Sequence, residues 1–372
     1  MGKRKSYRDL KAEVWDRGIC AGCGACVAVC PADAICFGET GGTPCPSNIG
    51  YCKEVYDEVP CGACYYACPR TGVFKEEILG QYQTIITAKA GFDVPKRQSG
   101  GAVTALLANA LEAGMIDAIV TVSEDRWTLK PSSVVITSAE ELIHQAGSRY
   151  NWWVPLVAAL KTAVIERKFR RIAVVGVPCV VQALHSIRTS NHDLLMPYGT
   201  SIRFIVGLFC TESFDYAALV EGKLKKEYQV DTWKVERLDV RGKLEVKMKD
   251  GSSLLLPMSE LETTVRPGCH HCLDLTAVYS DISAGSVGSD PGYTSLIIRN
   301  DVGNLFMESA AKNKKLIFGP EADIAAIERL ASLKVQKNRC KKTLNISLFQ
   351  KIIDIYRDYT GQLYHLSKWL YY

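Results

Sequence analysis

The sequence predicts an α+β protein made of a cysteine-rich head, a mixed α/β body and a C-terminal helical tail. Ten of the fifteen cysteines lie between Cys20 and Cys68, whereas segments typical of strands and helices alternate from residue 82 onward. The last part of the chain carries apolar residues at helical spacing. These three observations divide the chain into residues 1–80, 81–320 and 321–372.

The composition is that of an ordinary globular protein. Of the 372 residues, 47% are hydrophobic and 23% are charged, which excludes disordered, collagenous and coiled-coil proteins. The net charge of +5 is too small to indicate nucleic acid as a partner. No uncharged apolar run approaches the roughly 18 residues of a transmembrane segment, and the N-terminus has no apolar stretch typical of a secretory signal. We therefore expect a cytoplasmic protein with no transmembrane segment.

The head opens with the motif C-x2-C-x2-C-x3-C-P, which residues 20–31 fill as CAGCGACVAVCP. This run is typical of bacterial two-cluster ferredoxins, in which three close cysteines hold one [4Fe–4S] cluster and the fourth reaches the neighbouring cluster. Gly22 and Gly24 allow the backbone to wrap closely around a cluster. Pro31 turns the chain away, so that Cys30 points to a second site.

The second half of the head consists of Cys52 and the run CGACYYACP at residues 61–69. Eight residues separate Cys52 from Cys61, where two are usual. Cys45, held between two prolines, is therefore an alternative ligand to Cys52, and a structural zinc site is an alternative for the whole head. The simplest assignment crosses the two halves: one cluster is held by Cys20, Cys23, Cys26 and Cys68, and the other by Cys30, Cys52, Cys61 and Cys64.

The body begins with YQTIITAKA, whose β-branched residues predict a first strand at residues 82–90. The pattern that follows predicts helices at 101–113, 155–167 and 216–228, strands at 116–122, 171–177 and 204–210, and a hairpin at 244–256 that turns at Asp250-Gly251.

Four of the body cysteines stand at positions where they can meet. Cys179 and Cys210 each follow a buried strand, in GVPC and GLFC, and Cys269 and Cys272 form a C-x2-C pair in PGCHHC. Two strand ends and one loop can bring four thiolates to one edge of a sheet, which would form a third [4Fe–4S] site. The alternative is two buried structural cysteines beside an unrelated zinc or an empty loop pair.

Two segments of small residues are candidate cofactor contacts. Ser99, Gly100 and Gly101 stand at the start of a predicted helix, where free N–H groups and the helix dipole favour an anionic group. The loop DISAGSVGSDPGYTS, which contains Ser286 and Gly288, permits close approach of a flat ring or a phosphate. An ordinary helix cap and plain turn geometry are the respective alternatives.

Six segments in this order, SGGAVTALLANALEAG, GSRY, GVPC, GLFCTESF, PGCHHC and DISAGSVGS, resemble one family. It is the beta subunit of coenzyme F420-reducing hydrogenase and of related F420-dependent dehydrogenases, and the resemblance covers roughly residues 82–315. The double ferredoxin motif of the head is similar to that of extended members such as the input subunits of F420H2 dehydrogenase.

The resemblance implies that the body binds FAD, takes coenzyme F420 as its substrate and holds a [4Fe–4S] cluster through Cys179, Cys210, Cys269 and Cys272. It also implies which residues contact the cofactors. Lys130 matches a Lys-Pro pair of the family, and Arg149 stands where the family has lysine. The implied contacts are Ser99, Gly100, Gly101, Lys130, Arg149, Tyr150, Ser286 and Gly288.

The expected chemistry needs no catalytic side chain. Deazaflavins exchange a hydride, iron–sulfur clusters pass single electrons, and a flavin can do both. The expected route is therefore FAD, the body cluster, the two head clusters and then a partner. By resemblance, the partner is a redox subunit of a hydrogenase, formate dehydrogenase, heterodisulfide reductase or membrane complex. The alternatives are a flavin/iron–sulfur reductase of another organic acceptor on the same scaffold, and a pure electron-transfer subunit.

The last part of the tail, residues 344–372, places apolar and aromatic residues on one helical stripe. Packing of this helix on its own body is one interpretation. Docking to a partner subunit is the other, because tryptophan and tyrosine are enriched at interfaces.

Overall fold

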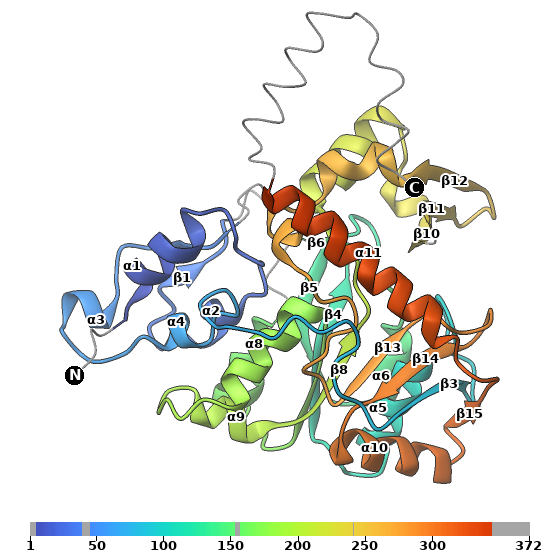
Figure 1. The fold of residues 1–372 in the computed structure, drawn as a ribbon, viewed down its shortest axis with the longest axis horizontal. Coiled ribbons are helices and arrows are strands. Elements are labelled where there is room, and N and C mark those ends of the chain that lie inside the picture. The colour runs from blue at the N-terminus through green and yellow to red at the C-terminus, as the bar shows by residue number, and fades with distance from the viewer. Residues whose placement is uncertain (1–4, 39–44, 153–156, 241, 344–372) are drawn as a thin grey trace, which may run out of the picture.

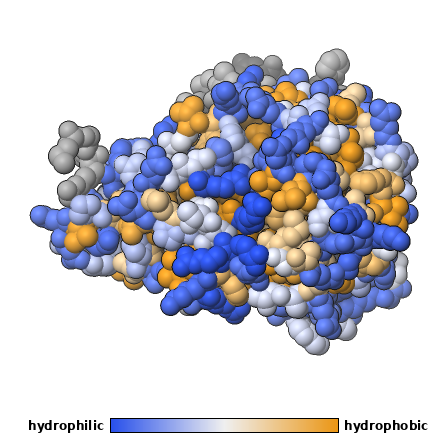
Figure 2. All heavy atoms as spheres, turned by 90° about the horizontal axis from the view of Figure 1, so that it is seen from below, coloured by the Kyte–Doolittle hydropathy of each residue, from blue (hydrophilic) through white to orange (hydrophobic). Residues whose placement is uncertain are grey.

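The computed structural model describes residues 5–38, 45–152, 157–240 and 242–343, and the predicted tail helix at 344–372 lies outside this part of the chain. The head projects from one side of the body as a narrower lobe, at the left in both Figure 1 and Figure 2. None of the helices in the described ranges is both long and apolar enough to cross a membrane.

The body is built on an eight-stranded mixed sheet with the order β15-β3-β14-β13-β8-β7-β4-β5. Its four central strands β13, β8, β7 and β4 run parallel, and antiparallel strands flank them on both sides. The strand bounds are β3 (Thr84–Ala90), β4 (Ala118–Glu124), β5 (Pro131–Ile136), β7 (Ile172–Gly176), β8 (Ile202–Leu208), β13 (Ile282–Gly285), β14 (Thr294–Ile298) and β15 (Leu316–Phe318). The strands predicted at 82–90, 116–122, 171–177 and 204–210 are confirmed.

Helices cover both faces of the sheet. Side chains alternate between the two faces of a strand, so each face contributes to an apolar core of its own. In β4, Ala118 and Val120 belong to one apolar core, whereas Ile119 belongs to the other. The first core also contains residues of α7 (Ala159–Lys161), η2 (Thr162–Glu166), α8 (Pro178–Arg188) and α9 (Met196–Ser201). The second contains residues of α5 (Ala102–Glu112), α6 (Ala139–His144) and α10 (Asp301–Lys312).

A smaller antiparallel sheet packs at one end of the body. It consists of β10 (Val235–Val240), β11 (Lys243–Met248) and β12 (Ser253–Pro257), and Gly251 turns the predicted hairpin with a φ of 88°. The helix predicted at 216–228 is present as η3 (Ala217–Glu227), but its hydrogen bonds are of the π type, as from Tyr228 N to Lys223 O. Short elements complete the body: β6 (Asn151–Trp152), β9 (Phe214–Asp215), η4 (Thr232–Lys234), η5 (Met258–Thr264) and η6 (Pro267–His271).

The head repeats one local structure twice. Each Cys-Gly-Ala-Cys sequence begins a one-turn helix, and the glycine before it, Gly24 or Gly62, has a left-handed backbone with φ near 80°. Glycine adopts this conformation at little cost, which explains its place in both motifs. The elements of the head are α1 (Tyr7–Leu10), η1 (Lys11–Trp15), α2 (Ala25–Ala28), β1 (Ile35–Cys36), β2 (Ser47–Asn48), α3 (Lys53–Tyr56) and α4 (Ala63–Tyr66).

A long helix, α11 (Ile324–Thr343), runs across the body towards the head (Figure 1). It falls in the segment that the sequence predicts as a separate extension from residue 321. Ile327 and Ala331 of this helix are buried, so its first turns pack on the body.

Asp281, just before β13, ties several elements of the body together. Its carboxylate is 1% exposed and accepts hydrogen bonds from Arg188 Nη1 at 2.9 and 3.0 Å, from Ile205 N at 2.7 Å and from Asn300 Nδ2 at 2.9 Å. A buried carboxylate with this many partners joins α8, β8 and the start of α10 to β13.

We expect Asp281→Ala to destabilise the protein by roughly 3 kcal/mol or more, because Arg188 then keeps a largely buried, unpaired charge. The measurement is the midpoint of urea-induced unfolding. Glu227→Ala, which removes an exposed partner of Lys223, is the control and should cost less than about 0.5 kcal/mol. Equal shifts for the two variants would contradict the structural role of Asp281.

Candidate functional site

Twelve cysteines of the described chain lie in three groups of four. We call them the first head group, the second head group and the body group. The first head group is Cys20, Cys23, Cys26 and Cys68. The second head group is Cys30, Cys52, Cys61 and Cys64, and the body group is Cys179, Cys210, Cys269 and Cys272. In the described residues no three His, Cys, Asp or Glu side chains have the spacing of ligands to a single metal ion.

The first head group is buried at the base of the head. Burial, followed by the neighbouring thiols of Cys68 and Cys20, raises the pKa of Cys23 to about 12. Burial and the thiols of Cys23 and Cys68 likewise raise the pKa of Cys26 well above its ordinary value. These shifts follow from crowding thiols out of water, because burial disfavours the charged form and like charges repel.

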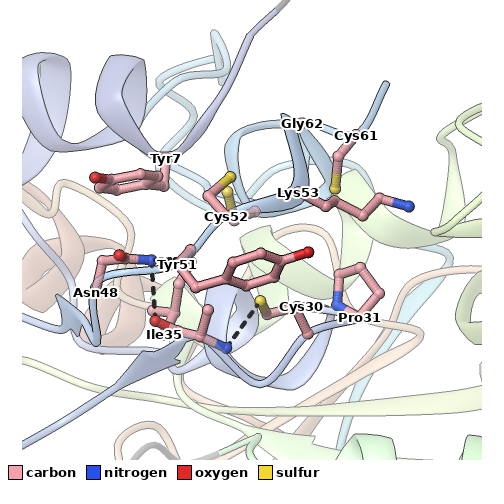
Figure 3. Close-up of a pocket in the computed structure, with 13 residues that line it drawn as sticks. Tyr7, Cys30, Pro31, Ile35, Asn48, Tyr51, Cys52, Lys53, Cys61 and Gly62 are labelled. Atoms are coloured by element: carbon pink, nitrogen blue, oxygen red, sulfur yellow. Dashed lines mark hydrogen bonds between the residues drawn. The ribbon is translucent and has the colours of Figure 1, made fainter. Parts of the chain in front are cut away.

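The second head group lines one open cavity. In Figure 3 the sulfur atoms of Cys30, Cys52 and Cys61 turn towards a shared space, and Tyr51 lies across it. Burial and then Cys30, Cys61 and Cys52 raise the pKa of the fourth thiol, Cys64. Cys30 of the first run therefore lies with Cys52, Cys61 and Cys64 of the second half of the head.

Cys45, the alternative to Cys52, lies elsewhere. It is not among the residues that line this cavity. Its thiol instead contributes, after burial, to the raised pKa of Cys20 in the first head group. Burial and then the carboxylate of Asp16 raise the pKa of Cys45. The structure thus brings Cys52 to the second head group.

The body group forms where parallel strands end. Cys179 lies in the first turn of α8 directly after β7, and Cys210 follows β8 by two residues. Cys269 and Cys272 come from the loop around η6. Burial, followed by the thiol of Cys272, raises the pKa of Cys179, and Cys23 of the first head group contributes to the same shift. The body group therefore lies beside the first head group.

Two side chains of α11 complete the surroundings of the body group. Lys334 Nζ donates to Cys210 O and Asp274 O, both at 2.6 Å, and lies 3.5 Å from Cys272 Sγ. Burial lowers the pKa of Lys334, but Cys272, Cys210 and Asp274 together hold it above its ordinary value. One turn later, Asn338 Nδ2 donates to Cys269 O at 3.0 Å and Cys272 O at 2.7 Å.

Neither residue belongs to the predicted site. In the sequence, Lys334 and Asn338 are related only by their i, i+4 spacing, in a helix that is otherwise rich in exposed charges. This spacing alone does not indicate that they contact the body group. A lysine that is only 6% exposed does, however, need a partner of opposite charge.

Ser99 and Gly100 pack against the start of β14. Gly100 N donates to Thr294 Oγ1 at 3.0 Å, and Ser99 Oγ lies 3.0 Å from the same atom. A Cβ on Gly100 would lie 2.6 Å from Ala88 O, so close packing requires this glycine. Gly101 precedes α5 with a φ of 71° and offers no side chain to cap the helix.

The loop that contains Ser286 and Gly288 lies under the start of α11. Gly288 O accepts from Asp323 N at 2.9 Å, and a Cβ on Gly288 would lie 2.7 Å from Ile327 Cγ1. Packing against α11 therefore accounts for this glycine. Thr294, at the end of this loop, contacts Ser99 and Gly100, so the loop also lies near the start of α5.

Arg149 lines a second open cavity, which five basic side chains surround. Burial lowers the pKa of Arg149, and no hydrogen-bond acceptor in the described residues reaches its buried Nε. The carboxylates along this cavity are Glu124, Glu236 and Asp239. We call it the basic cavity, after Lys96, Arg126, Arg149, Arg237 and Lys249.

The basic cavity holds its cations close to one another. Burial, followed by Arg126 and Arg149, lowers the pKa of Lys96. Burial raises the pKa of Glu124 even though Arg149, Lys96 and Arg126 oppose that rise. Crowded, partly buried cations bind an anion favourably, because the anion relieves their mutual repulsion and supplies charge-assisted hydrogen bonds.

The remaining predicted contacts of this region, Tyr150 and Lys130, do not line the cavity, although each follows a residue that does. Burial raises the pKa of Tyr150 to about 12. Side-chain hydrogen bonds with Gln98 and Ser148, which also bond to each other at 2.7 Å, oppose this rise. Tyr150 thus lies next to the segment of Ser99. Lys130 instead packs with its Nζ 5.6 Å from the centre of the Tyr216 ring and does not line the basic cavity.

Comparison with known protein families gives three matches. The N-terminal part of the coenzyme F420 hydrogenase/dehydrogenase beta subunit matches residues 85–161, and the C-terminal part matches residues 169–324. A 4Fe-4S binding domain matches residues 14–35.

Individual relatives agree with these matches. An uncharacterized protein of Methanocaldococcus jannaschii is 40% identical over 91% of this chain and 99% of its own. One of the subunits of the F420H2 dehydrogenase of Methanosarcina mazei is 31% identical over 88% of this chain and 92% of its own. Among solved structures, a chain of the F420-reducing [NiFe] hydrogenase complex from Methanosarcina barkeri has a TM-score of 0.67 at 30% identity, over 72% of this chain and 94% of that chain.

The position of Cys52 leads to a test of the second head group. After anaerobic reconstitution with iron and sulfide, we expect Cys52→Ala to lose about four of roughly twelve irons, because one [4Fe–4S] cluster then lacks a ligand. Cys45→Ala is the matched control and should keep its iron. Loss of iron in the Cys45 variant and retention in the Cys52 variant would reverse the assignment.

Proposed function

Because the chain belongs to the family of coenzyme F420 hydrogenase/dehydrogenase beta subunits, we propose that it transfers a hydride between coenzyme F420 and FAD. In this proposal it also passes single electrons through three [4Fe–4S] clusters, to or from a partner redox subunit. The observation that carries the proposal is the succession of three four-cysteine groups, with the body group beside the first head group.

The cysteine groups suit iron–sulfur clusters. Each supplies four thiols, the set that a [4Fe–4S] cluster requires, and the second head group lines a single cavity. Thiols release their protons when they bind a metal. Lys334, which donates to backbone carbonyls around the body group, offsets part of the resulting negative charge. Asn338 fixes the two carbonyls of the Cys269–Cys272 loop and so holds that loop in place.

The cofactor site is proposed for the region around three segments: the start of α5, the loop that contains Ser286 and Gly288, and the segment of Arg149 and Tyr150. The uncapped start of α5 after Gly101 suits an anionic group of FAD, because its first N–H groups have no side-chain partner from the cap residue. Arg149 and the cations around it suit the anionic part of FAD or of coenzyme F420. A bound flavin supplies the exchange between hydride and single-electron chemistry. The protein orients the cofactors and excludes water.

Reaction with coenzyme F420 tests the proposal directly. We expect anaerobically reconstituted protein to oxidise reduced coenzyme F420 rapidly in the presence of an electron-accepting dye, and to leave NADH unchanged. The measurement is the deazaflavin absorbance against the NADH absorbance under the same conditions. Oxidation of NADH but not of the deazaflavin would favour a reductase with another substrate, and a protein without flavin would favour a pure electron-transfer subunit.

Arg149 provides a second test. We expect Arg149→Met to weaken binding of FAD or of coenzyme F420 by roughly ten- to a hundredfold, because a hydrogen bond to a charged group contributes about 1.5–3 kcal/mol. Flavin content after gel filtration reports the first effect, and KM for the coenzyme reports the second. Arg171→Met, which removes an exposed partner of Asp117, is the control. Unchanged flavin content and KM in the Arg149 variant would remove the basic cavity from the site.

A further inference from the structure

Arg70 joins the head to the body at the cysteine groups themselves. It follows Cys68 by two residues, and its Nε donates to Ile19 O, next to Cys20, at 3.1 Å. From the same guanidinium, Nη2 donates to Gly268 O at 3.0 Å and Nη1 to His271 O at 3.1 Å. The planar fork of arginine thus binds three carbonyls of two loops that are far apart in the sequence.

Arg266 makes the reciprocal contact from the body. Its side chain is 3% exposed, and Nη1 donates to Ala21 O, inside the first cysteine motif, at 2.8 Å. The guanidinium carbon lies 3.9 Å from the centre of the Trp152 ring, and Trp152 Nε1 donates to Gly22 O at 2.9 Å. Stacking on an aromatic face orients the guanidinium as well as stabilising it.

The two loops touch so closely that neither tolerates a side chain at the contact. A Cβ on Gly268 would lie 2.0 Å from Cys20 O, and a Cβ on Gly22 would lie 2.1 Å from Arg266 Nη2. Gly22 also has a left-handed backbone with φ of 67°. The glycines and the arginines therefore form one interlocked contact between the loops that carry Cys20 and Cys269.

We propose that Arg70 and Arg266 are positioning residues for electron transfer, which fix the distance between the first head group and the body group. This inference rests on the proposed function, because it requires a [4Fe–4S] cluster in each group. Oxidation of one reduced coenzyme yields two electrons and two protons. The protons pass to solvent, and the electrons cross this contact one at a time to the external acceptor.

The charges of both arginines lie next to cysteines of the two groups. Arg70 binds Ile19 O, next to Cys20, and Gly268 O, next to Cys269, while Arg266 binds Ala21 O, also next to Cys20. A positive charge beside a cluster favours its reduced form and so raises its potential. Arg70 and Arg266 thus influence both the distance across the contact and the driving force.

The experiment uses the full-length holoprotein with the variants Arg70→Gln, Arg70→Lys and Arg266→Gln, and Arg171→Gln as the exposed control. Iron and flavin contents are measured first, to show that the sites are loaded. Stopped-flow absorbance then follows reduction of the flavin and of the clusters by reduced coenzyme F420. Electron paramagnetic resonance of the reduced protein reports the magnetic interaction between neighbouring clusters, and a redox titration gives their potentials.

We expect the glutamine variants to keep wild-type flavin reduction, while cluster reduction slows roughly tenfold or more and the magnetic interaction weakens, since small displacements have large effects on reacting groups. Arg70→Lys keeps the charge but not the three-point fork, so the potentials should return to wild type while cluster reduction stays slow. If a glutamine variant fails to load iron, the lysine variant carries the test.

Wild-type cluster reduction and magnetic interaction in all loaded variants would overturn the positioning role. That outcome differs from failure of the proposed function, in which the wild-type protein itself would hold no iron or would not react with coenzyme F420.

Discussion

The structure depends on crowding twelve cysteines together in groups of four, each of them partly or fully buried. Burial raises the pKa of thiols such as Cys23 and Cys179, and crowding adds to the cost of ionising them. The arrangement is favourable only when a cation takes up the charge of the thiolates, and structural metal binding then contributes to folding. Lys334, Arg70 and Arg266 lie where they stabilise that negative charge from outside. These three side chains join α11, the head and the loop around η6 to the cysteine groups.

The sequence predicts much of each cysteine group because part of the geometry is local. A C-x2-C pair around a left-handed glycine, Gly24 or Gly62, places two thiols within a few residues, and the ends of parallel strands meet at one edge. The choice between Cys45 and Cys52 is not local, because the long interval before Cys61 leaves the path of the chain open. Only the packed head brings Cys52 into the cavity with Cys30.

Residues that reach a site from a distant element escape such reasoning. Lys334 and Asn338 come from a helix that the sequence assigns to an extension, and the basic cavity gathers Lys96, Arg126 and Lys249 from three separate segments. Charged residues of this kind are typical of any solvated surface, so composition and spacing do not distinguish them. Their role becomes visible only through burial and through partners of opposite or equal charge.

The contact between head and body changes how the head is understood. A boundary at residue 80 separates the motifs, yet Ala25, Ala28 and Ala63 of the head pack into the same apolar core as Leu160 and Val180 of the body. A ferredoxin-like module on a flexible linker would reach its electron donor by diffusion. Here the apolar core and the hydrogen bonds of Arg70 and Arg266 both hold the head in one position. Under the proposed function, the path between the first head group and the body group is therefore built into the fold, and the second head group is left as the terminus that faces a partner.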